Sequence, residues 1–188
     1  HCGVVGVKPS YGLVSRYGLV DLGMSFDQIG VLSKNVSDAV LLLNVTKGKD
    51  EKDATSYKSE EIKLEKLGRV RIGIPKIKIQ DKRISQLIDK KVKEVAGKEK
   101  WDVESVELKH IDLGVQTYYP IVYVEFFSGT RKFDGRRFGR KIEDSCGEEV
   151  LRRILGGAEI SKAEFGGRYY RRALKAKQLI KQEFESAF

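Results

Sequence analysis

The chain has 188 residues, of which 40% are hydrophobic and 34% are charged, a balance typical of globular proteins and unlike that of disordered or fibrous ones. The formal net charge of +9 raises the question of a nucleic-acid partner, although acidic residues are spread along the whole chain. The longest apolar run, residues 39–43, is far shorter than the roughly 18 residues that a membrane span requires, so no membrane-spanning helix is expected.

Glycine is frequent in the first 32 residues, and short apolar pairs such as Val4-Val5 and Leu19-Val20 lie between the glycines. Glycine permits positive φ angles and close approach of two backbones. This pattern therefore predicts short strands joined by tight turns.

Residues 34–47 are apolar on nearly every side at helical spacing, which predicts a buried helix. Ser33 and Asn35 are both candidates for its N-cap. The charged and polar residues 49–68 that follow predict a connection on the surface.

A strand, a helix and a second strand are predicted in the middle of the chain. Residues 69–75 alternate between polar and apolar, residues 82–97 place their apolar side chains on one helical face, and residues 103–108 again favour a strand. This order and spacing indicate a βαβ-like unit.

The second half of the chain contains one ambiguous segment. The aromatic and β-branched residues of 117–131 favour a strand, whereas the length of the run and Thr117 as an N-cap favour a helix. Residues 147–156 and 161–188 carry helical apolar spacing and are expected to form helices.

These elements predict an α/β fold in which a mixed β-sheet is covered by helices. Residues 1–48 supply core strands and a buried helix, and residues 69–188 supply a flanking α/β portion. Residues 49–68 connect these two portions of one partial domain.

The residues themselves do not indicate a catalytic chemistry. The two histidines, His1 and His110, both stand in contexts unlike that of a catalytic triad. No P-loop, GxGxxG or HExxH motif occurs. Cys2 and Cys146 form no CxxC or Cys/His cluster, so a metal site is not expected.

An ordered set of motifs nevertheless fills the first 43 residues. Its parts are CGVVGVKPSYG at residues 2–12, VSRYG at 14–18 and SFDQIG at 25–30. This series strongly resembles the amidase signature family, and it implies the amidase-type mixed sheet of that family.

Three later stretches resemble the branch of this family that serves tRNA-dependent amidation. They are FDGRRFG at residues 133–139, GEEVLRRILGG at 147–157 and the aromatic and basic helix that begins at 169–170. The resemblance thus covers nearly the whole chain.

The resemblance implies an activity and a set of partners. Subunits of this branch release ammonia from glutamine or asparagine and pass it to a B-type subunit, with or without a C-type one, which amidates misacylated Glu-tRNA(Gln). ATP and Mg²⁺ serve the partner subunit, and no cofactor is expected in this chain. The setting implied is the cytoplasm, with no membrane partner.

Amide hydrolysis in the family uses a Ser–cis-Ser–Lys triad, in which an activated serine attacks the amide carbon. All three triad residues are expected upstream of His1. The chain is therefore expected to be an incomplete fragment that contains no catalytic residue and is inactive by itself.

Four residues match positions that the family places at or near the substrate. Tyr118 corresponds to a tyrosine beside bound glutamine, and Arg153 to an arginine that grips the α-carboxylate, a task that suits the guanidinium fork. Asp27 and Gln28 are expected to support the site from behind. The simpler interpretations are a packing aromatic for Tyr118 and a surface arginine for Arg153.

Two other functions remain open. One is a general amidase of the same family that acts on another small amide. The other is a basic module that binds RNA, because residues 131–141 interleave arginine and lysine with Phe133 and Phe138.

Overall fold

The computed structural model describes residues 2–188, which form two compact units. The first unit comprises the residues up to Glu65 together with Val122–Glu159. The second comprises Lys66–Ile121 and Ile160–Phe188. Each unit is described by itself below.

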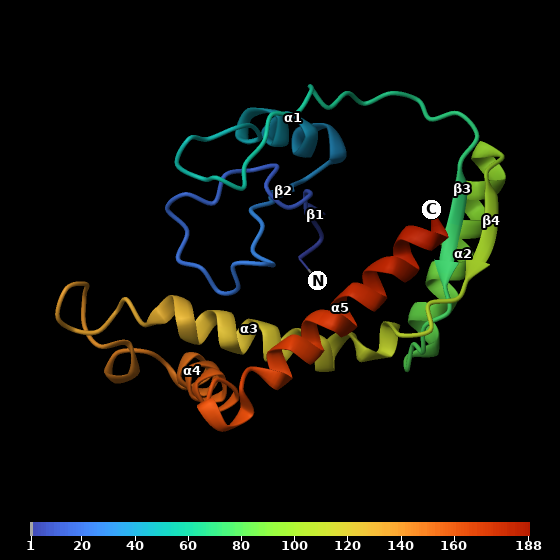
Figure 1. The fold of residues 1–188 in the computed structure, drawn as a ribbon. Helices are drawn as coiled ribbons and strands as arrows, with labels where there is room; N and C mark the ends of the chain where they lie inside the picture. Colours follow the sequence, from blue (N-terminus) through green and yellow to red (C-terminus); the bar gives the residue numbers. More distant parts are fainter. Residues whose placement is uncertain (1) are drawn as a thin grey trace. The chain divides into compact units, whose positions relative to one another are not determined.

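The first unit contains an antiparallel pair of short strands, β1 (Val5–Val7) and β2 (Val31–Ser33), in which Gly6 lies opposite Leu32. Helix α1 (Val36–Thr46) packs on this pair (Figure 1). The expectation of short strands and turns is confirmed. The small core that results is made by Leu13, Val14, Val31, Ala39 and Leu43.

Helix α1 starts where the sequence predicts, but it is not buried on all sides. Its N-cap is Asn35, whose side-chain oxygen accepts the Asp38 N–H at 2.8 Å. Ala39 and Leu43 face the strands and are buried. Leu41, Leu42, Val36 and Val45 are exposed, because within residues 2–188 the strands cover one side of the helix.

The second unit contains the predicted βαβ element. Strand β3 (Arg71–Pro75) leads into α2 (Lys82–Glu99), and β4 (Asp102–Val106) returns parallel to β3 (Figure 1). Asp81 caps the start of α2 by accepting the Arg83 N–H at 2.9 Å. Lys100 ends the helix in the left-handed conformation.

The ambiguous segment is a helix, α3 (Gly114–Thr130). Its buried residues recur at intervals of one, three or four positions, which is a helical pattern and not an alternating one. They are Thr117, Ile121, Val122, Glu125, Phe126 and Thr130. This burial overrides the preference of aromatic and β-branched residues for strands.

Two further helices, α4 (Glu148–Ile160) and α5 (Arg168–Ala187), confirm the remaining predictions. Short 3-10 turns occur at Ile111–Leu113, Ile142–Asp144 and Ala163–Phe165.

The α/β class is thus confirmed. In residues 2–188 the strands form two separate two-stranded sheets, one antiparallel and one parallel. None of the described helices is long and apolar enough to cross a membrane.

Candidate functional site

Asp27 fixes the loop in which it lies. Its Oδ2 accepts the N–H of Leu22 at 2.8 Å and the N–H of Gly23 at 3.1 Å. The carboxylate therefore supports the backbone just ahead of it.

The same loop is held from α3 by a residue that the sequence interpretation missed. The Oε2 of Glu125 accepts the N–H of Ser25 at 2.9 Å, and Glu125 is only 6% exposed. A carboxylate inside the apolar run VYVEFF (residues 122–127) is the signal that could have found it, since buried carboxylates are rare unless they have partners.

Tyr11 and Arg16 also hold the loop of residues 22–27 in place. The Tyr11 hydroxyl donates to the Met24 carbonyl at 2.7 Å, and Arg16 Nη1 donates to the same oxygen at 2.6 Å. The guanidinium of Arg16 also lies over the Tyr11 ring, 4.6 Å from its centroid. Residues 22–27 therefore have a fixed shape although they form neither helix nor strand.

Asp53 ties the chain after α1 to Arg16. Its Oδ2 accepts the Arg16 N–H at 2.8 Å, and its Oδ1 accepts the Thr55 hydroxyl at 2.7 Å. The Thr55 hydroxyl, followed by the backbone N–H groups of Arg16 and Thr55, lowers the pKa of Asp53 from 3.8 to about 2. The buried side chains of Asp53 and Ser56 show that this stretch is more than a surface connection.

A polar cavity of about 200 Å³ lies beside these contacts in the first unit. Its walls combine carboxylates with cations, so it suits a small polar or zwitterionic molecule better than an apolar one. Within residues 2–188 no group of His, Cys, Asp and Glu side chains is arranged to hold a metal ion. The cavity is lined by Arg16, Tyr17, Leu19, Asp21, Met24, Asp27, Lys52 and Asp53.

Gln28 makes a different contact from that of Asp27. Its Oε1 accepts a hydrogen bond from Lys8 Nζ at 2.7 Å. This bond links the end of the loop to the residue directly after β1.

Two adjacent arginines on α4 differ sharply in environment. Glu149 Oε1 accepts from Arg152 Nη2 at 2.7 Å and from Arg153 Nε at 2.9 Å. Arg152, followed by Arg153, lowers the pKa of Glu149 to about 2. The side chain of Arg152 is 53% exposed and also donates to the Tyr123 hydroxyl, whereas that of Arg153 is 20% exposed.

One hydrogen-bond donor of Arg153 is unpaired in the part of the chain that the structure describes. Its Nη1 is buried and has no hydrogen-bond partner among residues 2–188. A buried, unpaired donor on a charged group is costly. The simple interpretation of Arg153 as a surface arginine describes Arg152 better.

Tyr118 lies in the second unit, on the first half of α3, with its ring edge-on to Tyr119 at a centroid distance of 5.4 Å. Asp27, Gln28 and Arg153 lie in the first unit. Within that unit Arg153 bonds to α4, while Asp27 and Gln28 bond to residues 8–23. Within the first unit, Arg153 and the Asp27–Gln28 pair thus bond to different elements.

His110 lies in the second unit and is paired with α5. Its Nδ1 is 2.7 Å from Glu183 Oε1, and its backbone N–H donates to Glu183 Oε2 at 3.0 Å. These bonds fasten the turn after β4 to the helix, a structural use of the side chain. His1 lies outside the described residues.

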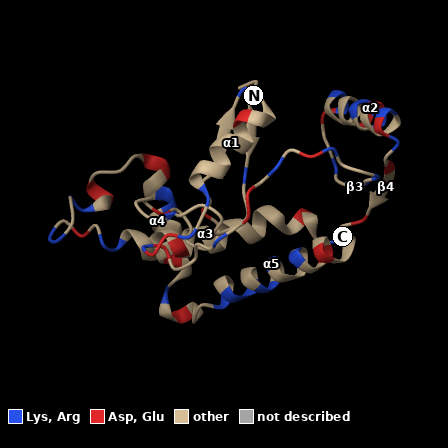
Figure 2. Ribbon diagram, turned by 90° about the horizontal axis from the view of Figure 1, so that it is seen from above, with Lys and Arg blue, Asp and Glu red and all other residues tan. Residues whose placement is uncertain are grey.

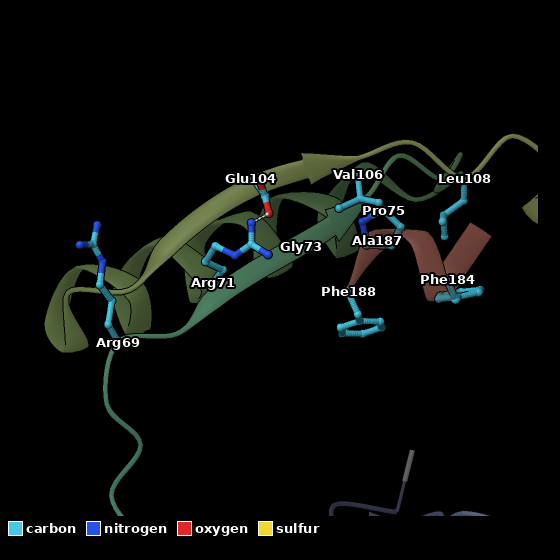
Figure 3. Close-up of a pocket in the computed structure, with 10 residues that line it drawn as sticks. All are labelled: Arg69, Arg71, Gly73, Pro75, Glu104, Val106, Leu108, Phe184, Ala187 and Phe188. Atoms are coloured by element: carbon cyan, nitrogen blue, oxygen red, sulfur yellow. Dashed lines mark ion pairs between the residues drawn. The ribbon is translucent and has the colours of Figure 1, made fainter. Parts of the chain in front are cut away.

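A second cavity, of about 340 Å³, lies in the second unit between the β3–β4 pair and the end of α5 (Figure 3). Its arginines are paired with carboxylates of β4: Arg71 with Glu104 at 3.4 Å, and Arg69 with Asp102 at 2.9 Å. The remaining wall is mostly apolar, and none of the predicted site residues contributes to it. The polar groups of the first unit therefore remain the candidate site described by the structure, and Tyr118 stays a prediction of its own in the second unit.

Comparison with known proteins defines the class. The whole chain, residues 1–188, matches the model of the Amidase family. The protein therefore belongs to the amidase family.

The relatives in that family carry one and the same protein name. The chain is 49% identical over 185 residues to the A-type subunit of glutamyl-tRNA(Gln) amidotransferase from Methanocaldococcus jannaschii, with 97% of this chain and 42% of the relative covered. It is 50% identical over 190 residues to the protein of the same name from Methanococcus maripaludis, with 100% and 44% covered. The chain thus spans less than half the length of these relatives.

Solved structures agree. The crystal structure of the protein of the same name from Thermotoga maritima matches with a TM-score of 0.76 and 34% identity, covering 99% of this chain and 40% of that one. An allophanate hydrolase from Kluyveromyces lactis, at 22% identity and a TM-score of 0.73, covers 96% of this chain and 30% of its own length, and it supports the fold alone.

Proposed function

We propose that this chain is part of the glutamine-hydrolysing subunit of a tRNA-dependent amidotransferase, which supplies the ammonia that converts Glu-tRNA(Gln) to Gln-tRNA(Gln). The names of the relatives at 49% and 50% identity support this assignment. The nucleophilic serine, the cis-serine and the lysine of the family are assigned to sequence outside residues 1–188. A B-type subunit, with or without a C-type one, is proposed to use ATP and Mg²⁺ in the cytoplasm.

Arg153 is the structural observation that supports the proposal. Its buried Nη1 has no partner among the described residues, while Glu149 holds its Nε and so fixes the plane of the guanidinium. A planar, oriented guanidinium with a donor in reserve is suited to bind a carboxylate. The α-carboxylate of glutamine satisfies that donor, and a substrate without a carboxylate leaves it unpaired.

The other predicted residues take supporting parts in this proposal. Tyr118 contacts the bound glutamine, and its ring is braced edge-on by Tyr119. Asp27 holds the backbone N–H groups of Leu22 and Gly23, and Gln28 accepts a hydrogen bond from the side chain of Lys8.

The test compares the two neighbouring arginines in the full-length protein that carries this chain. Arg153→Ala is expected to raise KM for glutamine roughly 10- to 100-fold with a smaller change in kcat, because a hydrogen-bonded charge contact is lost. Arg152→Ala removes the same charge from the same helix turn and is expected to change KM less than about twofold. Equal effects of the two substitutions on KM would contradict the role of Arg153.

The competing general amidase makes the opposite prediction. If the full-length protein hydrolyses a simple amide such as propionamide but not glutamine, the chain belongs to a general amidase instead. If it hydrolyses both, Arg153→Ala should impair glutamine hydrolysis and spare the simple amide, which has no carboxylate for the guanidinium to bind.

Residues 1–188 by themselves are expected to show no amidase activity, because the proposed nucleophile is not among them. Ammonia release from glutamine by the purified 188-residue chain, above a blank without protein, would show that this chain contains its own catalytic residues.

A further inference from the structure

The loop between α3 and α4 is closed at its base and has a defined shape. Arg131 Nη1 pairs with Glu143 Oε1 at 2.6 Å, and the Phe133 carbonyl accepts the Ile142 N–H at 3.2 Å. Asp134 forms an isolated antiparallel bridge with Lys141. The residues that this bridge encloses, 135–140, are called the arginine tip below.

The backbone of the arginine tip is held from inside. Asp134 Oδ1 accepts the N–H of Arg136 at 2.8 Å and that of Arg137 at 3.1 Å, and these two bonds lower the pKa of the Asp134 carboxyl. Gly135 and Gly139 both adopt positive φ, +75° and +56°, which glycine tolerates best. The turn is therefore stabilised without using the side chains of its arginines.

Those arginines are exposed and unpaired. Among residues 2–188 no carboxylate forms an ion pair with Arg136, Arg137 or Arg140. At the base of the loop, by contrast, Arg131 is paired with Glu143, and Lys132 lies 3.4 Å from a carboxylate oxygen of Asp21. Figure 2 shows the resulting cationic stretches along the loop that joins α3 to α4.

An apolar ring stands among these charges. Phe138 is 60% exposed, and it lies between Arg137 and Arg140 in the sequence. A single exposed aromatic ring is common on protein surfaces, but here it stands beside unpaired guanidinium groups and offers a flat apolar face next to positive charge. A partner that presents negative charge and a flat apolar surface together would use both features.

We propose that the arginine tip is an RNA-binding surface, on which the three guanidinium groups contact phosphates and Phe138 stacks on an unpaired base. Arginine pairs with phosphate through two parallel N–H bonds, and aromatic rings flanked by arginine are a common platform for unstacked bases in RNA. This inference goes beyond the proposed function, because it assigns an RNA contact to this chain itself and not to a partner subunit.

Helix α2 differs from the arginine tip in its charge pattern, and the difference favours RNA as the partner of the tip. It also carries many cations, but Asp89, Glu94 and Glu99 are interleaved with them, and Lys91 is paired with Glu94 at 2.8 Å. That mixture is typical of a solvated helix face. The arginine tip has no carboxylate between residues 135 and 140.

The test measures the affinity of the full-length protein for unfractionated tRNA by fluorescence anisotropy over a range of KCl concentrations. The triple variant R136A/R137A/R140A is expected to bind at least about tenfold more weakly at low salt. Its slope of log K against log salt is expected to fall by about two to three, since each phosphate contact contributes about 0.7–0.9. Phe138→Ala is expected to weaken binding roughly fivefold or more with the slope unchanged, because stacking releases no counterions.

Two variants keep the result interpretable. K90A/K93A/K98A removes three cations from α2 and is expected to change RNA affinity less than about twofold. R136K/R137K/R140K preserves the charge and is expected to keep most of the salt slope, which separates loss of charge from misfolding of the loop. Glutamine hydrolysis, measured on the same samples, is expected to be unaffected by the substitutions in the tip.

Three outcomes would overturn the proposal. The first is an unchanged RNA affinity in the triple alanine variant, and the second is an equal loss of RNA affinity in the α2 control variant. The third is a triple alanine variant that no longer copurifies with its partner subunits but retains its RNA affinity. The last would make the tip a protein-docking surface. Failure of glutamine hydrolysis in the unaltered protein would instead count against the proposed function and would leave the RNA measurement intact.

Discussion

The loop region of the first unit and the βαβ element of the second unit satisfy their polar groups in different ways. In β3, α2 and β4 the backbone bonds are those of helix and strand, and the carboxylates of the strands lie in exposed ion pairs such as that of Asp102 with Arg69. In residues 11–27 side chains take this role, with Asp27 and Glu125 accepting backbone N–H groups. Apart from Asp81, which caps the start of α2, carboxylates thus hold the backbone in the first region and lie in exposed ion pairs in the second.

Glu125 offers the strongest test of this contrast. Glu125→Ala leaves the Ser25 N–H without its acceptor and removes a buried side chain from α3. We expect a loss of about 1–3 kcal/mol in the free energy of unfolding, the usual range for a donor left without its acceptor away from water. Urea denaturation of the full-length protein, followed by intrinsic fluorescence, measures it.

The isosteric variant Glu125→Gln serves as the control. Its side-chain oxygen can still accept the Ser25 N–H, so it should retain most of the stability that the alanine variant loses. If both variants unfold at the same urea concentration as the unaltered protein, Glu125 does not hold the loop.

Asp53 predicts a pH dependence of intermediate size. Its pKa is about 2 in the folded chain against 3.8 ordinarily, so its ionised form is favoured by folding. The resulting stability is fully present above about pH 4 and is lost as the pH falls from about 4 to about 2. The difference in melting temperature between the unaltered protein and Asp53→Asn should therefore narrow over that interval, as followed by circular dichroism. A difference that stays constant down to about pH 2 would remove Asp53 as the source.

The two regions also differ in what their sequence discloses. The alternation of residues 69–75 and the amphipathic spacing of 82–97 identify the βαβ element directly, because regular backbone bonding imposes regular side-chain periods. The irregular loop has no period, and its assignment depends on the resemblance of its motifs to those of a family. The apolar run around Glu125 marks it as a buried carboxylate, but the partners of Glu125 and Asp53 could not be predicted because they are 100 and 37 residues away in the chain.

The candidate site shows the same division. The motif resemblance predicts a role for Arg153, but sequence alone cannot distinguish it from Arg152 in environment, since only packing makes one mostly buried and the other exposed. The buried face of α1 is overestimated from sequence for a related reason. The apolar spacing of α1 shows which of its faces are hydrophobic. It does not show which of these faces the other described residues pack against.

The exposed ion pair of Arg69 with Asp102 provides the smallest expected effect and the sharpest check on the contrast. Its two bonds, at 2.9 and 3.1 Å, have good bidentate geometry, and the contact with Arg69 lowers the pKa of Asp102. Both side chains are nevertheless at least half exposed, so water screens the attraction and competes for the same hydrogen bonds. We therefore expect Arg69→Ala to shift the melting temperature of the full-length protein by no more than about 1 °C, in low and in high salt. If Arg69→Ala destabilised the protein as much as Glu125→Ala does, this ion pair would anchor the start of β3. The two regions would then rely on their carboxylates to the same degree.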